Sequence, residues 1–167
     1  ALLSGVLTKT GIYGIMPVSF CLLAREEWFG YVLLAIAVIT MLLGAILALA
    51  SVDLKRVLAC SSLSQIGFIL VGVAVYVISG MHNELAARGT LIYMVNHSVL
   101  KLVLFMAAGV IYMNTHTLDL NALKGFGRKK PILHACFALG VLGISGIPFF
   151  NGYIGKTLIH EGLVETA

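Results

Sequence analysis

Two stretches of this chain, residues 28–52 and 57–81, run without a single charged side chain and are rich in apolar residues. A helix needs about 20 apolar residues to cross the roughly 30 Å hydrocarbon core of a bilayer, so each stretch is long enough for one crossing. Charged residues make up 11% of the chain, whereas an ordinary soluble domain has about a quarter. We therefore expect a membrane protein.

The apolar pattern predicts an all-α, polytopic transmembrane helix bundle of about five spans. They are expected at about residues 1–24, 29–51, 57–79 and 89–113, and from Pro131 to about Leu163. Pro17 has no amide hydrogen to donate, which predicts a kink in the first span. The last span should be a broken helix, because glycines, serine and Pro148 interrupt it between Gly143 and Asn151.

Basic residues in the loops predict the orientation of these spans. Six cations fall in loops on one side of the membrane: Lys55, Arg56, Lys124, Arg128, Lys129 and Lys130. The opposite side has only Arg25 and Arg88. The positive-inside rule places the six cations in the cytoplasm, as in a multi-pass protein of a bacterial or archaeal cytoplasmic membrane. The net charge of +4 follows this topology and does not indicate a nucleic-acid partner.

Enzyme motifs and metal sites are not predicted. Cys21, Cys60 and Cys136 lack the spacing of a zinc, iron–sulfur or haem site, and we expect no cofactor and no catalytic redox site in this chain. The sequence begins inside an apolar run and ends without a membrane-exit signal, so we expect a piece of a longer protein.

Lys101 is the strongest candidate for a functional residue. It lies at the midpoint of the predicted span 89–113, about 18 Å of helix from either interface. At this depth its side chain cannot extend to bulk water. Inserting a charge at the centre of a transmembrane helix costs at least about 2.5 kcal/mol. Lys101 must therefore lose its proton, have a partner or lie in a wet cavity. Each of these predicts a functional site, and a purely structural lysine is the alternative.

His97 and Tyr93 precede Lys101 by one and two turns on the same helical face. Histidine both accepts and donates a proton near neutral pH, so His97 and Lys101 could form a proton relay. The alternative for His97 is a hydrogen bond between helices. Asn96 lies on a different face, where we expect it to hydrogen-bond to a neighbouring helix.

Further polar residues are weaker candidates for the same proton pathway. Lys9 lies in the first span, and Lys156 follows the predicted break with His160 one turn later. Each lysine could instead extend to the interface. Ser61 and Gln65 begin the third span, where they could line a water wire or serve only helix packing. All seven carboxylates lie outside the four clearest apolar runs, and we expect none inside the membrane in this chain. Either another part of the protein supplies one, or the lysines act in their neutral form.

Four sequence stretches resemble the antiporter-like membrane subunits of respiratory complex I, Mrp-type antiporters and membrane-bound hydrogenases. They are ALLSGVLTKTGIY at 1–13, DLKRVLACSSLSQIG at 53–67, YMVNHSVLK at 93–101 followed by LFMAAG at 104–109, and GIPFFNGYIGK at 146–156. These stretches occur in the family's order and cover nearly the whole chain.

The resemblance implies an architecture and roles for particular residues. The full subunit would contain about fourteen helices in two inverted repeats, and residues 1–167 would form the end of the first repeat and most of the second. Lys9 matches the connecting lysine of the first half-channel, and His97 and Lys101 match the central pair of the second. Lys156 matches the residue beside the second broken helix. A further family histidine is replaced by Tyr93.

The resemblance also implies a function. The chain would translocate protons within a redox-driven complex of the NADH:quinone oxidoreductase or hydrogenase type, with other membrane subunits as partners. Two alternatives stay open: a subunit of a multisubunit cation/proton antiporter, which could also carry sodium, and a fragment that serves only assembly.

Overall fold

The computed structural model describes residues 8–21, 27–80 and 82–166. In these ranges the chain is all-α, as predicted, and forms seven helices. They are α1 (Thr8–Cys21), α2 (Glu27–Leu49), α3 (Leu54–Ile78), α4 (Glu84–Thr115), α5 (Phe126–Lys129), α6 (Pro131–Ser145) and α7 (Asn151–Thr166).

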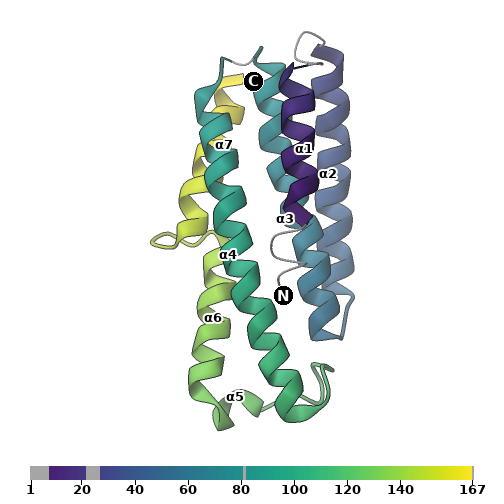
Figure 1. The fold of residues 1–167 in the computed structure, drawn as a ribbon, viewed down its shortest axis with the longest axis vertical. Helices are drawn as coiled ribbons and strands as arrows, with labels where there is room; N and C mark the ends of the chain where they lie inside the picture. Colours follow the sequence, from purple (N-terminus) through teal and green to yellow (C-terminus); the bar gives the residue numbers. More distant parts are fainter. Residues whose placement is uncertain (1–7, 22–26, 81, 167) are drawn as a thin grey trace.

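The long helices lie side by side along one axis of the molecule (Figure 1). The α2–α3 connection and the short helix α5 lie at one end, and the α3–α4 connection lies at the other (Figure 1). The predicted topology is therefore confirmed where it puts Lys55 and Arg56 at the same end as the basic segment 124–130. That this end faces the cytoplasm stays a prediction.

Capping residues fix the ends of the two central helices. Asp53 accepts hydrogen bonds from the amides of Lys55 and Arg56 and caps α3. Asn83 accepts one from the amide of Ala86 and caps α4, so that this helix begins before its apolar run. Consequently α4 extends over 84–115, beyond the predicted 89–113.

Glycines bring the helices into close contact. A methyl group on Gly67 of α3 would lie 2.8 Å from the carbonyl oxygen of Ala37 in α2. A methyl group on Gly155 of α7 would lie 2.7 Å from Cβ of Tyr93 in α4. Small residues let membrane helices pack backbone to backbone, and here they fix α3 against α2 and α7 against α4.

The predicted break in the last span is confirmed. Helix α6 ends at Ser145, Gly146 adopts a left-handed conformation with φ of +84°, and α7 begins at Asn151. The two half-helices follow one another along α4, which packs against both (Figure 1). They occupy the region of the fifth expected span, and that they cross the membrane together stays a prediction. Pro17 lies inside α1, where the expected kink stays a prediction.

The outer surface of the bundle is apolar. Three described helices, α2, α3 and α4, are long and apolar enough to cross a membrane. Much of α2 is exposed, including large side chains such as Ile36, Ile39, Leu42 and Ile46. A soluble protein rarely exposes so extensive an apolar face. The chain is therefore a multi-pass membrane protein, whose outer side chains face lipid or other protein.

Candidate functional site: a row of polar side chains inside the bundle

Lys101 of α4 lies in the interior, with 1% of its surface exposed. Its ammonium nitrogen Nζ donates hydrogen bonds to Ser61 Oγ at 2.6 Å and to the carbonyl oxygen of Leu58 at 2.9 Å. Both acceptors belong to α3, which packs directly against α4. A buried lysine is costly unless its donors are satisfied, and these two neutral oxygens reduce that cost. The side chain is thus held inside the bundle and does not extend to an interface.

The carbonyl oxygen of Leu58 also accepts hydrogen bonds from two serine hydroxyls. Ser61 Oγ donates to it at 3.0 Å and Ser62 Oγ at 2.9 Å. Serines three and four residues after a carbonyl often make such bonds within a helix. Ser61 therefore accepts from Lys101 while it donates to the carbonyl that Lys101 also contacts. Linked hydrogen bonds of this kind strengthen one another in a low-dielectric interior.

His97 and Tyr93 continue the row along α4. His97 is as buried as Lys101, at 1% exposure, and its imidazole ring stacks on the Tyr93 ring with 6.3 Å between centroids and 13° between planes. The Tyr93 hydroxyl donates to Gln65 Oε1 of α3. Tyr93 and Lys101 are eight positions apart, so the row extends over about 12 Å of helix.

Lys156 meets this row from α7. Its Nζ lies 5.8 Å from the centroid of the Tyr93 ring and 6.0 Å from that of Phe68, within the range of cation–π attraction. The same Nζ donates to the carbonyl oxygens of Ile144 at 2.9 Å and Ser145 at 3.3 Å. These carbonyls end α6, where the helix dipole is negative and the last acceptors lack helical donors. Lys156 thus faces the interior, as expected, and its hydrogen bonds link α7 to the end of α6 across the break.

Gly146 makes this contact feasible. A Cβ atom at this position would lie 2.9 Å from Cδ and 3.4 Å from Nζ of Lys156. Its φ of +84° also belongs to the left-handed region, which other residues enter only at a cost. Gly146 therefore both turns the chain out of α6 and leaves room for the lysine.

The structure groups most of the predicted site residues and separates one. Lys101, Ser61, His97, Tyr93 and Gln65 lie along the α3–α4 contact, and Lys156 approaches from α7. His160, predicted as an accessory member, is exposed on the outer side of α7. Lys9 belongs to the first turn of α1, but its side chain lies outside the described part of the structure.

Hydrogen bonds from Asn96 and Asn83 to backbone carbonyls tie α4 to α7. Asn96 Nδ2 donates to the carbonyl of Asn151 at 3.1 Å, which confirms the expected bond between helices. Sequence reasoning missed Asn83, whose Nδ2 donates to the carbonyl of Gly162 at 2.6 Å. An asparagine just before an apolar helical run predicts a helix cap. It does not predict a further hydrogen bond to another helix, such as the one that Asn83 makes to Gly162.

A protein-family model and several known proteins match this chain. A model of the family described as NADH:quinone oxidoreductase/Mrp antiporter, TM, matches residues 1–167. Hydrogenase-4 component B of Escherichia coli (strain K12) is 38% identical over 98% of this chain and 25% of the relative. NAD(P)H-quinone oxidoreductase chain 4 1 of Synechococcus sp. (strain JA-3-3Ab) is 34% identical over 99% of this chain and 30% of the relative.

A third relative is formate hydrogenlyase subunit 3 of Escherichia coli (strain K12). It is 33% identical over 99% of this chain and 28% of its own length. The chain thus spans between about a quarter and a third of the length of these three relatives.

Proposed function

Because this chain belongs to the NADH:quinone oxidoreductase/Mrp antiporter transmembrane family, we propose that it is part of a membrane subunit that translocates protons in a redox-driven complex. Residues 1–167 would supply the end of one inverted repeat and most of the next. The electron-transfer chemistry would belong to partner subunits. The names of the relatives, which are parts of hydrogenase, formate hydrogenlyase and quinone oxidoreductase systems, support this assignment.

The burial of Lys101 is the observation that carries the proposal. Its ammonium group lies near the middle of a 32-residue helix and is held by a hydroxyl and a carbonyl of the next helix. Ionisable groups at this depth are expensive and usually mark an ion pathway. A lysine that only stabilised the bundle could be replaced by an apolar residue without this desolvation cost.

The neighbours of Lys101 suggest how a proton would move. His97 lies one turn away, its imidazole is of a type that can both accept and donate a proton, and water between the two side chains would complete the transfer. Beyond His97, the Tyr93 hydroxyl donates to the Gln65 side-chain amide. The Tyr93 ring also lies against the ammonium group of Lys156, so the row continues to that lysine. Because neighbouring ionisable groups titrate together, a change of charge at one lysine would alter proton occupancy at the next.

Replacement of Lys101 by alanine in the full-length protein tests this function. We expect Lys101→Ala to reduce proton uptake at least tenfold in vesicles that contain the complete complex, with assembly largely intact. His160→Ala is the matched control, since His160 is ionisable but exposed and should leave uptake unchanged. Normal uptake by Lys101→Ala would refute the pathway and favour a purely structural role.

A cation/proton antiporter without redox coupling is the second candidate, because the family description includes Mrp antiporters. The same buried row would then exchange protons for sodium. Proton movement that requires a sodium gradient and persists without an electron donor would favour this alternative. Proton movement that requires electron donor and acceptor, and is indifferent to sodium, would favour the redox-driven complex.

A further inference from the structure

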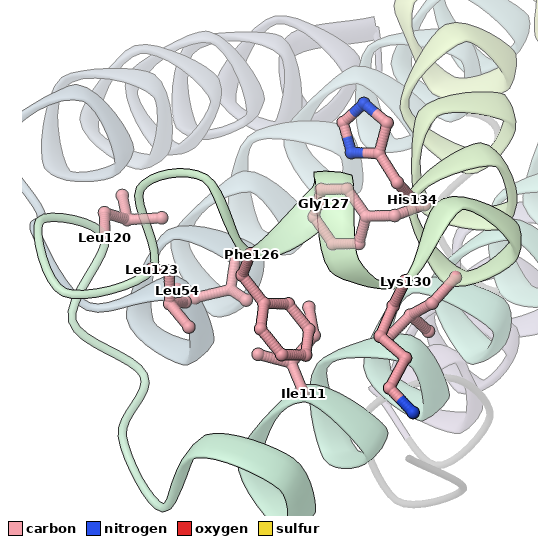
Figure 2. Close-up of a pocket in the computed structure, with 10 residues that line it drawn as sticks. Leu54, Ile111, Leu120, Leu123, Phe126, Gly127, Lys130 and His134 are labelled. Carbon is pink, nitrogen blue, oxygen red and sulfur yellow. The ribbon is translucent and has the colours of Figure 1, made fainter.

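An apolar cavity of about 200 Å³ lies at the basic end of the bundle. It is lined by the beginning of α3, the end of α4, the loop that includes α5, and the first turns of α6, and it is open on one side (Figure 2). Its walls are mostly aliphatic and aromatic, and two nitrogen-bearing side chains also line it. Leu54, Ile111 and Leu133 are among the apolar lining residues, and the two nitrogen-bearing ones are Lys130 and His134.

The loop that closes this cavity is fixed to the bundle. The amide of Leu54 donates to the carbonyl of Leu118, and the amide of Leu120 donates to the carbonyl of Val52. Residues 118–120 therefore pair with the segment that enters α3. These backbone hydrogen bonds hold the loop wall of the cavity in place against the start of α3.

The surroundings of the cavity are strongly cationic. Six basic residues occupy positions 55–56 and 124–130, against the two carboxylates Asp53 and Asp119, which leaves a net charge of +4 at this end. Both carboxylates already accept hydrogen bonds from backbone amides, Asp53 from Lys55 and Arg56, and Asp119 from Asn121. The basic side chains around the cavity are exposed.

We propose that this cavity binds an anionic phospholipid of the adjacent membrane leaflet. One acyl chain would occupy the space between Ile111 and Leu133, and the phosphate would lie beside Lys130 at the rim. Basic segments next to membrane helices attract anionic lipids, and an apolar cavity beneath them accepts hydrocarbon. The cavity is at membrane-interface depth because α4 ends and α6 begins there (Figure 1). The proposal does not depend on proton translocation.

The combination of charge and apolar wall selects this ligand. Inorganic phosphate would use the cations but not the apolar wall. A neutral phospholipid would use the wall but would gain little from the cations. Phosphatidylglycerol satisfies both, and phosphatidylcholine with the same acyl chains is its matched neutral counterpart.

Lipid binding to the full-length protein in its detergent-solubilised complex tests the proposal. After delipidation, native mass spectrometry would measure the binding of phosphatidylglycerol and phosphatidylcholine. Lys130→Gln should weaken phosphatidylglycerol binding about fivefold, the effect of one cation at a lipid surface. Lys55→Gln is the control, because it makes the same charge change at the same end outside the cavity, and its effect should be under twofold.

A second variant separates a cavity from a merely basic surface. Leu133→Trp fills the cavity without changing charge and should abolish retention of phosphatidylglycerol, while inorganic phosphate should not compete with the lipid in the parent. Three results would overturn the proposal: equal binding of the two lipids, equal effects of Lys130→Gln and Lys55→Gln, or undiminished retention by Leu133→Trp. Failure to bind either lipid, as expected if another protein segment covers the cavity, would overturn it as well.

Discussion

The serines at positions 61 and 62 offer a sharp test of how α3 supports Lys101. Both hydroxyls donate to the carbonyl of Leu58, at 3.0 Å and 2.9 Å, but Ser61 alone of the two also accepts the 2.6 Å bond from the Lys101 ammonium. Ser61→Ala removes an acceptor of a buried charge. Ser62→Ala removes a comparable neutral bond and leaves the acceptor in place.

The expected difference follows from the strength of the two kinds of bond. A hydrogen bond to a charged group contributes about 1.5–3 kcal/mol, and a neutral one about 0.5–1.5 kcal/mol. If proton transfer passes through the charged form of Lys101, Ser61→Ala raises the free energy of that step by the larger amount. Each 1.36 kcal/mol slows a step about tenfold, so the expected reduction is about 10- to 150-fold.

Proton uptake by vesicles, followed with a pH-sensitive dye and normalised to assembled complex, measures this effect. Ser62→Ala should change the rate by no more than a few-fold, because the Lys101 ammonium keeps both acceptors. Equal losses in the two variants, or no loss in Ser61→Ala, would show that this hydrogen bond does not support a charged state on the pathway.

Two glycine substitutions test the packing that places Lys156 against α4. Gly155→Ala puts a methyl carbon 2.7 Å from Cβ and 3.0 Å from Cα of Tyr93, whereas Gly109→Ala meets no atom within 4 Å and gains the same helix propensity. Overpacking costs about 1–3 kcal/mol, so the unfolding free energy of Gly155→Ala should be lower than that of Gly109→Ala by this amount. A detergent titration measures both values, and equal values would contradict the packing. Gly146→Ala forces alanine into the left-handed region at a cost of about 1–2 kcal/mol and displaces Lys156. Amide hydrogen exchange between α6 and α7 should therefore quicken, and unchanged exchange would mean that Gly146 is not required there.

The helices could be predicted from sequence because apolar run length and backbone breakers decide them. The expected spans 29–51 and 57–79 agree with α2 and α3 to within three residues at each end. The break was predictable because Gly146 and Pro148 disfavour a continuous helix. The start of α4 was placed five residues late, because hydropathy does not register a polar first turn that Asn83 caps.

The row on α4 was predictable from spacing, but its partners were not. Residues four apart share a helical face, which groups Tyr93, His97 and Lys101 without any tertiary information. The acceptors of Lys101 and Lys156 include the carbonyls of Leu58 and Ile144, and a backbone carbonyl has no sequence signature. Spacing also grouped His160 with Lys156, but in the structure His160 is exposed, whereas Lys156 is half-buried and lies against Tyr93 of α4.

For the loop between α4 and α6, the sequence predicts only a basic connection. Its pairing with the start of α3 depends on backbone hydrogen bonds between residues far apart in sequence. Helix α5 comprises four residues, too few for a periodic pattern. The cavity beneath it therefore had no detectable signal in the sequence.

Proton flux through a Lys101→Arg variant of the full-length protein tests the central claim most directly. Arginine keeps a positive charge and can donate to the same Leu58 and Ser61 oxygens, but guanidinium hardly releases a proton. The variant should assemble with the parent's thermal stability and lose nearly as much proton uptake as Lys101→Ala. Near-normal uptake would contradict the account, since position 101 would then supply a fixed charge and would not pass protons.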